Sequence, residues 1–226
     1  MSIVSVPQVC VDAPFRSRQP GQAMPDERPV PSREAMAQMP LFERLGLGQI
    51  TLVSSAQQAR HAVAQLTGVP VLGFDTESKP TFQRNEISDG PHVVQLATSR
   101  HAWVFQLHDI ECRAEVAQLL ASAAITKPGF GLGDDRRRII SKLGVEPQAV
   151  LELNDIFRRQ GYRRDMGVRG ATAVLFQQRF IKSKKASTSN WANLRLTEAQ
   201  IVYAANDAYA AVCVFNALQT MLARSE

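Results

Sequence analysis

Residues 71–77, with the sequence Val-Leu-Gly-Phe-Asp-Thr-Glu, constrain the fold more than any other segment. Their apolar start predicts a buried strand that ends in two acids. Because side chains alternate along a strand, Asp75 and Glu77 project from one face, and Phe74 and Thr76 from the other. Two carboxylates on one half-buried face repel each other, and a cation between them would relieve the repulsion. The alternative is a polar strand end with both acids in water.

Length and composition favour one globular domain. The chain has 226 residues, and 45% of them are apolar, which is enough for a sizeable core. No apolar run approaches the roughly 20 residues of a membrane span, and the N-terminus lacks the pattern of a secretory signal. Three scattered cysteines form neither a disulfide framework nor a zinc pattern. We therefore expect a cytoplasmic protein in a reducing compartment, without contact to a membrane.

Basic residues gather in the second half of the chain. Residues 127–195 hold 15 Lys and Arg against 6 Asp and Glu, whereas the remainder holds 11 against 15. Such an asymmetry indicates a polyanionic partner. The alternative is an ordinary solvated face.

The chain divides into an arm and a domain. Seven of the twelve prolines lie in the first 40 residues, so residues 1–45 are expected to form a flexible, Pro-rich arm. Residues 46–226 alternate between strand and helix patterns, with an antiparallel meander early in the series, which predicts an α/β domain with a mixed sheet flanked by helices. We expect strands at 50–53, 71–77, 92–98, 102–107, 125–130 and 151–153, and helices at 55–66, 111–122, 134–143, 167–180 and 197–223.

The last predicted helix carries a third acid. It is apolar on most sides and is therefore expected to be buried. Asp207 shares a face with Tyr203, four residues earlier, and with Ala211 and Val214. A buried carboxylate must be hydrogen-bonded, ion-paired or bound to metal, because an unpartnered one costs several kcal/mol. The structural alternative is a hydrogen bond to Tyr203 or to the backbone.

A fourth acid lies where the glycine-rich segment 129–133 turns into the helix predicted at 134–143. Asp135 aligns with Ile139 at a spacing of four and is expected to face inward, whereas Asp134 aligns with Arg138 and faces outward. Both acids also suit the positive end of a helix dipole, which is the alternative explanation for each.

Inward-facing acids on separate elements indicate a site for hard divalent cations. Mg²⁺ and Mn²⁺ prefer oxygen ligands, and four carboxylates suit two metals roughly 4 Å apart, as in phosphoryl transfer. None of the four histidines falls in these motifs, which argues against zinc hydrolysis. The Ser and Cys residues lack a base at motif spacing, which argues against covalent catalysis.

These motifs resemble those of a known family. FDTE at 74–77, GFGLGDD at 129–135 and YAANDAY at 203–209 are similar, in order, to the three motifs of the DEDDy 3′–5′ exonucleases. The group with the greatest likeness contains RNase D and the exonuclease domain of the Werner syndrome helicase. Ser189-Asn190-Trp191 followed by Leu196-Thr197-Glu198 also matches the approach to the third motif. The resemblance covers about residues 50–222.

The resemblance implies an RNase H-like fold and hydrolysis of phosphodiester bonds from the 3′ end, releasing nucleoside monophosphates with two Mg²⁺ or Mn²⁺ ions. It implies that Asp75 bridges both metals and that Glu77 and Asp207 complete the ligands of the metal that activates the water. Asp135 resembles the acid that holds the other metal, and Tyr203 resembles the tyrosine that orients the attacking water. The phenol pKa near 10 favours positioning of the water over proton abstraction at neutral pH.

The expected substrate is DNA or RNA with a free 3′ end, and the sequence does not choose between them. Because the chain ends soon after the last helix, we expect a stand-alone catalytic domain without the accessory domain of RNase D. The rival interpretation is a catalytically silent nucleic-acid-binding or adaptor protein on the same fold.

Contacts to the substrate are expected from cationic and aromatic residues near the acids. Nonspecific strand binding needs phosphate contacts and stacking platforms. We expect such contacts from Thr76, Lys184, Lys185 and Trp191, with Phe82 as a further stacking candidate, although core packing is the alternative for both aromatics. Segment 182–190 lacks periodicity and is expected to form a mobile loop over the site. The clusters are Arg136-Arg137-Arg138, Arg158-Arg159, Arg163-Arg164 and Lys182-Ser183-Lys184-Lys185, with a solvated helix surface as the alternative for the arginines.

Overall fold

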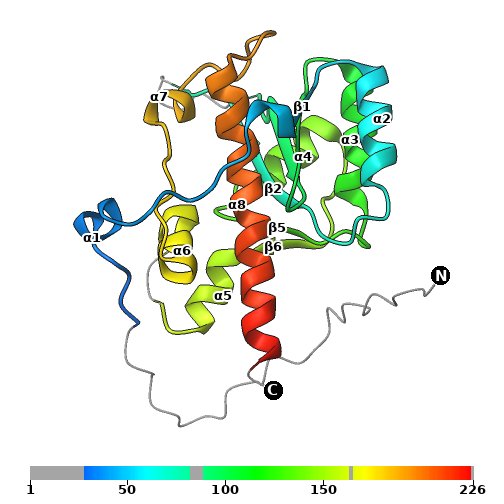
Figure 1. Cartoon of the computed structure of the whole chain (residues 1–226). Coiled ribbons are helices and arrows are strands. Elements are labelled where there is room, and N and C mark those ends of the chain that lie inside the picture. The colour runs from blue at the N-terminus through cyan, green and yellow to red at the C-terminus, as the bar shows by residue number, and fades with distance from the viewer. Residues whose placement is uncertain (1–27, 82–88, 163–164, 225–226) are drawn as a thin grey trace, which may run out of the picture.

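The computed structural model describes residues 28–81, 89–162 and 165–224. Figure 1 shows the whole fold, whose centre is a four-stranded sheet. The strand order is β1-β4-β3-β2, and β2 is therefore an edge strand of this sheet. β1 runs parallel to β4, whereas β3 is antiparallel to both of its neighbours, which confirms the expected meander in a mixed sheet. The strands are β1 (Ile50–Val53), β2 (Gly73–Glu77), β3 (Val93–Ala97) and β4 (Ala102–Gln106).

A second, smaller pair of strands extends the sheet region. β5 (Lys127–Gly129) and β6 (Val150–Glu152) pair in parallel, close to the ranges that the sequence predicts. An isolated parallel bridge between Val71 and Thr126 connects this pair to the approach of β2. The segment just before β2 is therefore paired with the segment just before β5.

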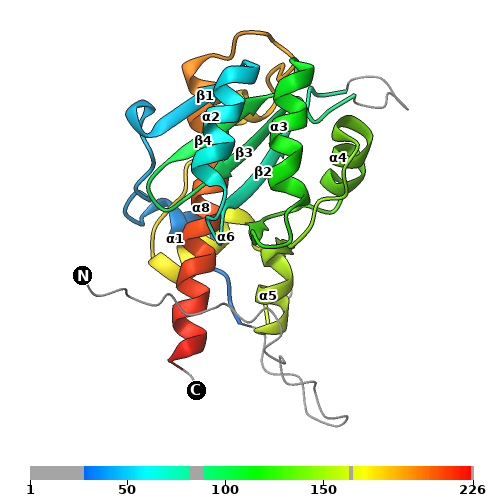
Figure 2. The ribbon, with the colours of Figure 1, turned by 90° about the vertical axis from the view of Figure 1, so that its right-hand side faces the viewer.

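Helices cover both faces of the sheet, so the predicted class of a mixed sheet flanked by helices is confirmed. On one face, α2 (Ala56–Leu66) and α3 (Ile110–Ala121) pack together over Phe74, Leu96 and Phe105 (Figure 2). On this side α4 (Asp135–Leu143) contributes the buried Ile139 to the same core.

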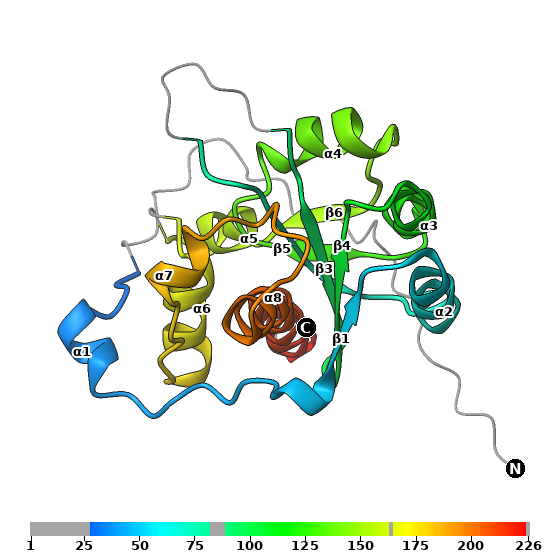
Figure 3. The same cartoon turned by 90° about the horizontal axis from the view of Figure 1, so that it is seen from above.

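The opposite face is covered by α8 (Glu198–Ala223). Thr197 and Gln200 form a reciprocal capping box at its start, as the sequence predicts. Seen from above, α8 lies between the sheet and α6 (Gly167–Phe176) (Figure 3). By length and hydropathy α8 could cross a membrane, but 67% of its apolar window is buried. An apolar helix of this kind is what the centre of a two-layer core requires.

Gly73 sets the distance between β2 and α8. A Cβ at this position would lie 2.0 Å from the carbonyl oxygen of Ala208 and 2.9 Å from the amide nitrogen of Val212. Only glycine therefore allows the helix backbone to approach the strand this closely. The contact lies two residues from Asp75 and one residue from Asp207, so it places the acidic residues relative to each other.

Three short helices lie where the sequence pattern gives no helix. α5 (Leu153–Arg159) follows β6 directly, and its buried face joins Leu153 and Phe157 to α8. α7 (Lys184–Ser187) begins at the N-cap Ser183 and buries Ala186, so the expected loop at 182–190 is partly helical. α1 (Arg33–Ala37) is capped by Ser32. Such short segments carry too few residues for a visible hydrophobic period.

Part of the expected arm packs onto the domain. Residues 1–27 lie outside the described residues, but Phe42 and Leu45 are 8% and 4% exposed and belong to the core. The side chain of Asn206 in α8 accepts a hydrogen bond from the amide of Leu45 (2.8 Å) and donates one to its carbonyl oxygen (3.1 Å). The packed unit therefore begins before residue 46, the expected boundary.

Candidate active site

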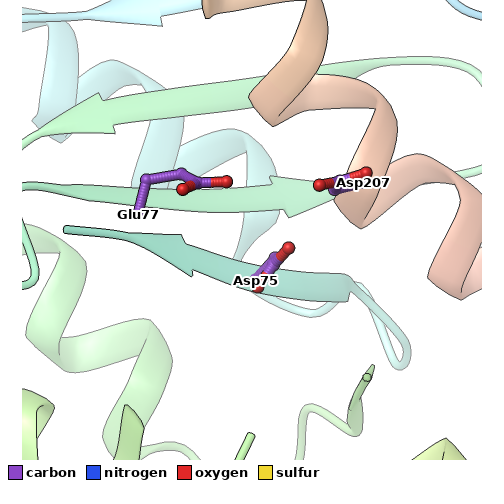
Figure 4. A group of neighbouring side chains, drawn as sticks. All are labelled: Asp75, Glu77 and Asp207. Atoms are coloured by element: carbon purple, nitrogen blue, oxygen red, sulfur yellow. The ribbon is translucent and has the colours of Figure 1, made fainter. Parts of the chain in front are cut away.

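Three carboxyl groups meet where β2 crosses α8. Asp75 and Glu77 project from β2 toward α8, and Asp207 projects from α8 toward β2 (Figure 4). One ligand oxygen from each residue lies within 4.8 Å of the other two. This agrees with the strand alternation and helical spacing that place these acids on facing surfaces.

Asp135 approaches this cluster from the other face of the sheet. Its Oδ1 accepts a 2.7 Å hydrogen bond from the hydroxyl of Thr76, whose side chain points away from Asp75 and Glu77. Because β2 is an edge strand, an acid on α4 can come close to acids on the opposite face. Asp134, in contrast, is exposed and pairs with Arg137 at 2.9 Å, so the two neighbouring acids face as the helical spacing predicts.

Burial and mutual repulsion raise the pKa values of the clustered acids. Burial is the main cause for Asp75, with further increases from the charges of Asp207 and Asp135. Burial and the charge of Asp75 raise the pKa of Glu77 to about 10. Burial also raises the pKa of Asp135 and of Asp207, although the charge of Lys182 opposes the rise at Asp207. The cluster therefore favours any positive charge that enters it.

Lys182 is the cation that lies against the cluster. Its Nζ is 2.7 Å from Asp207 Oδ2 and 5.3 Å from the ring centroid of Tyr203. Both oxygens of Asp207 are buried, so the ion pair with Lys182 compensates a charge that water does not reach. Sequence reasoning placed Lys182 in a cationic cluster but not at the acids, because nothing in the local pattern shows which lysine turns inward.

Tyr203 and Trp191 form the wall behind the acids. Their rings lie 5.9 Å apart, and Tyr203 is only 7% exposed. Burial and the nearby charge of Asp207 raise the pKa of Tyr203, which keeps the phenol protonated at neutral pH. Trp191 is 1% exposed, so the structure favours core packing over the expected stacking on a base. Phe82, the other stacking candidate, lies outside the described residues.

Gln95 is a further residue that the sequence did not single out. It lies in β3 directly opposite Asp75 and is fully buried. Neither polar atom of its side chain has a hydrogen-bond partner among the described residues. Opposed residues of an antiparallel pair project to the same face, so the Gln95 amide lies beside Asp75 on the face of the sheet that α8 covers.

Two cavities adjoin the acids on either side of β2. A cavity of about 310 Å³ is lined by Asp75, Asp207 and Lys182 together with Phe130 and Met166. A larger one of about 640 Å³ contains Asp135 and is also lined by Phe74. The two share Phe74, Gly131, Asn154 and Asp165, so both open along the same edge strand.

The acidic residues fit a divalent metal ion. Asp75, Glu77 and Asp207 supply only carboxylate oxygens, which are the ligands that Mg²⁺ and Mn²⁺ prefer. The buried carboxylate of Asp207, which already attracts the ammonium of Lys182, is the kind of group that a cation satisfies.

The predicted cationic contacts differ in their surroundings. Arg136, Arg137 and Arg158 are paired with acidic side chains, which favours the solvated helix surface for them. Lys184 and Lys185 are exposed on α7, and Lys184 shares a cavity of about 410 Å³ with Arg169 and Lys182. Arg163 and Arg164 lie outside the described residues. The exposed basic surface therefore centres on α7 and the start of α6.

The fold and the site together define an α/β domain with a cluster of acids at the edge of its sheet. The family model described as 3′–5′ exonuclease matches residues 50–223, and the chain belongs to this family. It is 27% identical over 157 residues to the bifunctional 3′–5′ exonuclease/ATP-dependent helicase WRN of Mus musculus. That match covers 68% of this chain and 11% of the mouse protein.

Solved structures show the same fold. The EXO domain of Aedes aegypti Nibbler superposes with a TM-score of 0.68 at 19% identity, covering 81% of this chain and 93% of that domain. Trypanosoma brucei RNase D, in complex with RNA U12, superposes with a TM-score of 0.67 at 20% identity, covering 82% of this chain and 64% of that one. The RNase H-like domain that the motifs imply is thus the fold of this chain.

Proposed function

We propose that this protein is an active 3′–5′ exonuclease that removes nucleoside monophosphates from the free 3′ end of DNA or RNA. The observation that carries the proposal is the group of Asp75, Glu77 and Asp207, whose ligand oxygens lie within 4.8 Å of one another. Membership of the 3′–5′ exonuclease family supports it. A domain with only a structural or adaptor role has no need to hold three repelling carboxylates in this way.

We assign the metal ligands to this cluster and to the acid beside it. Asp75, Glu77 and Asp207 would hold Mg²⁺ or Mn²⁺, with Asp135 contributing to a second ion. Two ions bound at such a site would supply a water nucleophile at neutral pH and would stabilise charge on the attacking and leaving oxygens. The protein's part is to hold the carboxylates in position before the substrate arrives.

Tyr203 is assigned to the orientation of the attacking water. Its ring contacts Trp191 and Lys182. Tyr203 lies in α8 one helical turn before Asp207, so the two side chains share a face of the helix. A buried phenol with a raised pKa stays protonated at neutral pH, so it can hydrogen-bond to a water molecule but does not serve as a base. The role of Tyr203 is therefore positioning.

The substrate is assigned to nucleic acid on three grounds. The chain is basic in its second half, exposed lysines of α7 lie near the acids, and a neighbour of the same fold is a complex with RNA. Lys184 and Lys185 are the proposed phosphate contacts. We keep the intracellular, reducing location as a proposal, which the free Cys112 and Cys213 fit.

The test is digestion of matched DNA and RNA oligonucleotides labelled at the 5′ end. We expect stepwise shortening from the 3′ end with Mg²⁺ or Mn²⁺ and none in EDTA. A 3′-blocked oligonucleotide is the matched control and should stay intact. Strand binding without shortening under any metal would favour the silent adaptor, and undiminished cleavage in EDTA would contradict the metal site.

A further inference from the structure

Lys182 stands where a positive charge is needed, and its backbone is held in place from both sides. Phe180, two residues earlier, is buried, and the following Ser183 caps α7. The carbonyl oxygen of Lys182 accepts a 2.8 Å hydrogen bond from Arg169 Nη2. These contacts fix the backbone of Lys182 beside the acids. Movement of the ammonium away from them therefore depends on the side chain.

The contact between Lys182 and Asp207 is asymmetric. The Asp207 side chain is 3% exposed, whereas the Lys182 side chain is 36% exposed. The anion is thus fixed in the core and the cation enters from the solvent side on a flexible stem. In such a pair the cation can leave without unfolding the protein, because its ammonium regains water.

Lys182 contacts the same residue that the metal centre requires. The ammonium lies beside Asp207 Oδ2, and one oxygen of the same carboxylate belongs to the group within 4.8 Å that includes Asp75 and Glu77. An ammonium and a divalent ion held by one carboxylate repel each other strongly in a partly buried site. Occupation by one therefore weakens binding of the other.

The ammonium has a second place to go. Lys182 also lines the neighbouring cavity of about 410 Å³ with Arg169, Lys184 and Ser187. This cavity and the one that contains Asp75 and Asp207 share Met166, Gly167 and Val168 besides Lys182, so the lysine side chain borders both of them.

We propose that Lys182 is an exchangeable counter-ion of the acidic cluster, which a divalent metal ion must displace from Asp207 in order to bind. Without metal, Lys182 compensates the repulsion among the acids and holds β2 and α8 together. With metal, its displacement weakens the apparent metal affinity. The inference rests on the metal site of the proposed function, and it concerns metal binding by the free protein.

The test is a calorimetric titration of the full chain with Mn²⁺, comparing wild type with Lys182→Met and Lys182→Arg. Methionine is one heavy atom shorter than lysine, but it keeps an unbranched apolar stem and removes the charge. We expect Lys182→Met to bind Mn²⁺ about tenfold more tightly, because no cation has to be displaced, and Lys182→Arg to stay close to wild type. Arg60→Met, on the far face of the sheet, is the matched control and should leave the affinity unchanged.

Thermal unfolding gives a second measurement that does not depend on activity. Without metal, Lys182→Met should unfold at a lower temperature than wild type. Mn²⁺ should raise the melting temperature of Lys182→Met by more than it raises that of wild type. If this variant does not fold without metal, Lys182→Gln is titrated in its place.

Unchanged or weaker Mn²⁺ binding in Lys182→Met, while Asp75→Asn abolishes binding in the wild-type background, would overturn this inference and leave the proposed function standing. Absence of Mn²⁺ binding in wild type and all variants would overturn the metal site and this inference together.

Discussion

The hydroxyl of Thr76 donates a 2.7 Å hydrogen bond to Asp135, and this bond connects the two faces of the edge strand β2. The amide of Thr76 also donates to Asp75 Oδ1, at 2.9 Å. One residue therefore orients an acid on each face. Because Thr76 is only 9% exposed, the geometry supports this orienting role. The expected contact between Thr76 and nucleic acid stays a prediction.

We predict that Thr76→Val lowers exonuclease activity about tenfold, because a hydrogen bond to a charged acceptor is lost while the shape is kept. The measurement is the initial rate at saturating substrate and metal. Thr76→Ser, which keeps the hydroxyl, is the control and should retain most of the activity. Equal rates for Thr76→Val and wild type would show that Asp135 needs no orientation from this side.

Asp134 and Asp135 are predicted to differ sharply. Asp135→Asn should reduce the rate on the order of 10²-fold, as when a preorganised charge is removed from a transition state. Asp134→Asn should have little effect, since its side chain is 70% exposed and pairs only with Arg137 among the described residues. The two variants are compared in the same rate assay, and the opposite order would mean that the second motif uses Asp134.

Stability should depend on pH and metal together. Raised pKa values at Asp75, Glu77 and Asp207 mean that the folded, metal-free protein binds protons that the unfolded chain has already released. The stabilisation from this protonation is complete below the unfolded pKa of about 4 and is lost as the pH rises toward the folded values, about 10 for Glu77.

We therefore predict that the metal-free melting temperature falls between about pH 5.5 and 8.5. Mg²⁺ binds the ionised carboxylates, so the difference in melting temperature with and without Mg²⁺ should widen over the same range. Glu77→Gln removes one titrating group and should flatten the metal-free curve. A difference that is constant with pH would argue that these acids do not titrate as a metal-binding cluster.

Gly73→Ala is predicted to separate β2 from α8. The added Cβ would lie 2.0 Å from the Ala208 carbonyl oxygen, so the helix must shift, at a cost of about 2–3 kcal/mol in the free energy of unfolding. Activity should fall as well, because Asp207 moves away from Asp75. Gly48→Ala is the matched control, since no described atom lies within 4 Å of its Cβ. Denaturant unfolding and the rate assay check the two effects.

The lysines of α7 are predicted to bind phosphate. Changing Lys184 and Lys185 together to Ala should reduce the slope of log affinity against log salt by about one unit or more, since each contact to a single strand contributes about 0.7. The Michaelis constant should rise while the rate at saturating substrate changes far less. An unchanged slope would identify these lysines as ordinary solvated residues.

The local sequence pattern was sufficient to predict the long helices and strands and the direction in which the acidic side chains project. Alternation predicts that Asp75 and Glu77 share a face, and helical spacing predicts that Asp207 and Asp135 point inward, as the structure has them. The local pattern cannot predict which residues that are distant in the chain contact each other in the fold. Lys182 and Asp207 are far apart in the chain, and the order of the strands decides that Asp135 reaches the cluster around an edge. The short α7 has too few residues for a period to show.

The two hydrogen bonds between Asn206 and Leu45 join the N-terminal segment to the helix position immediately before Asp207. The family match begins only at residue 50, whereas Phe42 and Leu45 are already buried in the core, so the packed unit is longer than the matched region. Cutting the chain at residue 50 would remove the Leu45 amide that donates to Asn206 Oδ1, next to Asp207, although the Asn206 amide nitrogen would keep its bond to the Val202 carbonyl oxygen. A protein shortened to the family boundary is therefore expected to lose part of the packing that holds the proposed metal ligand Asp207 in place.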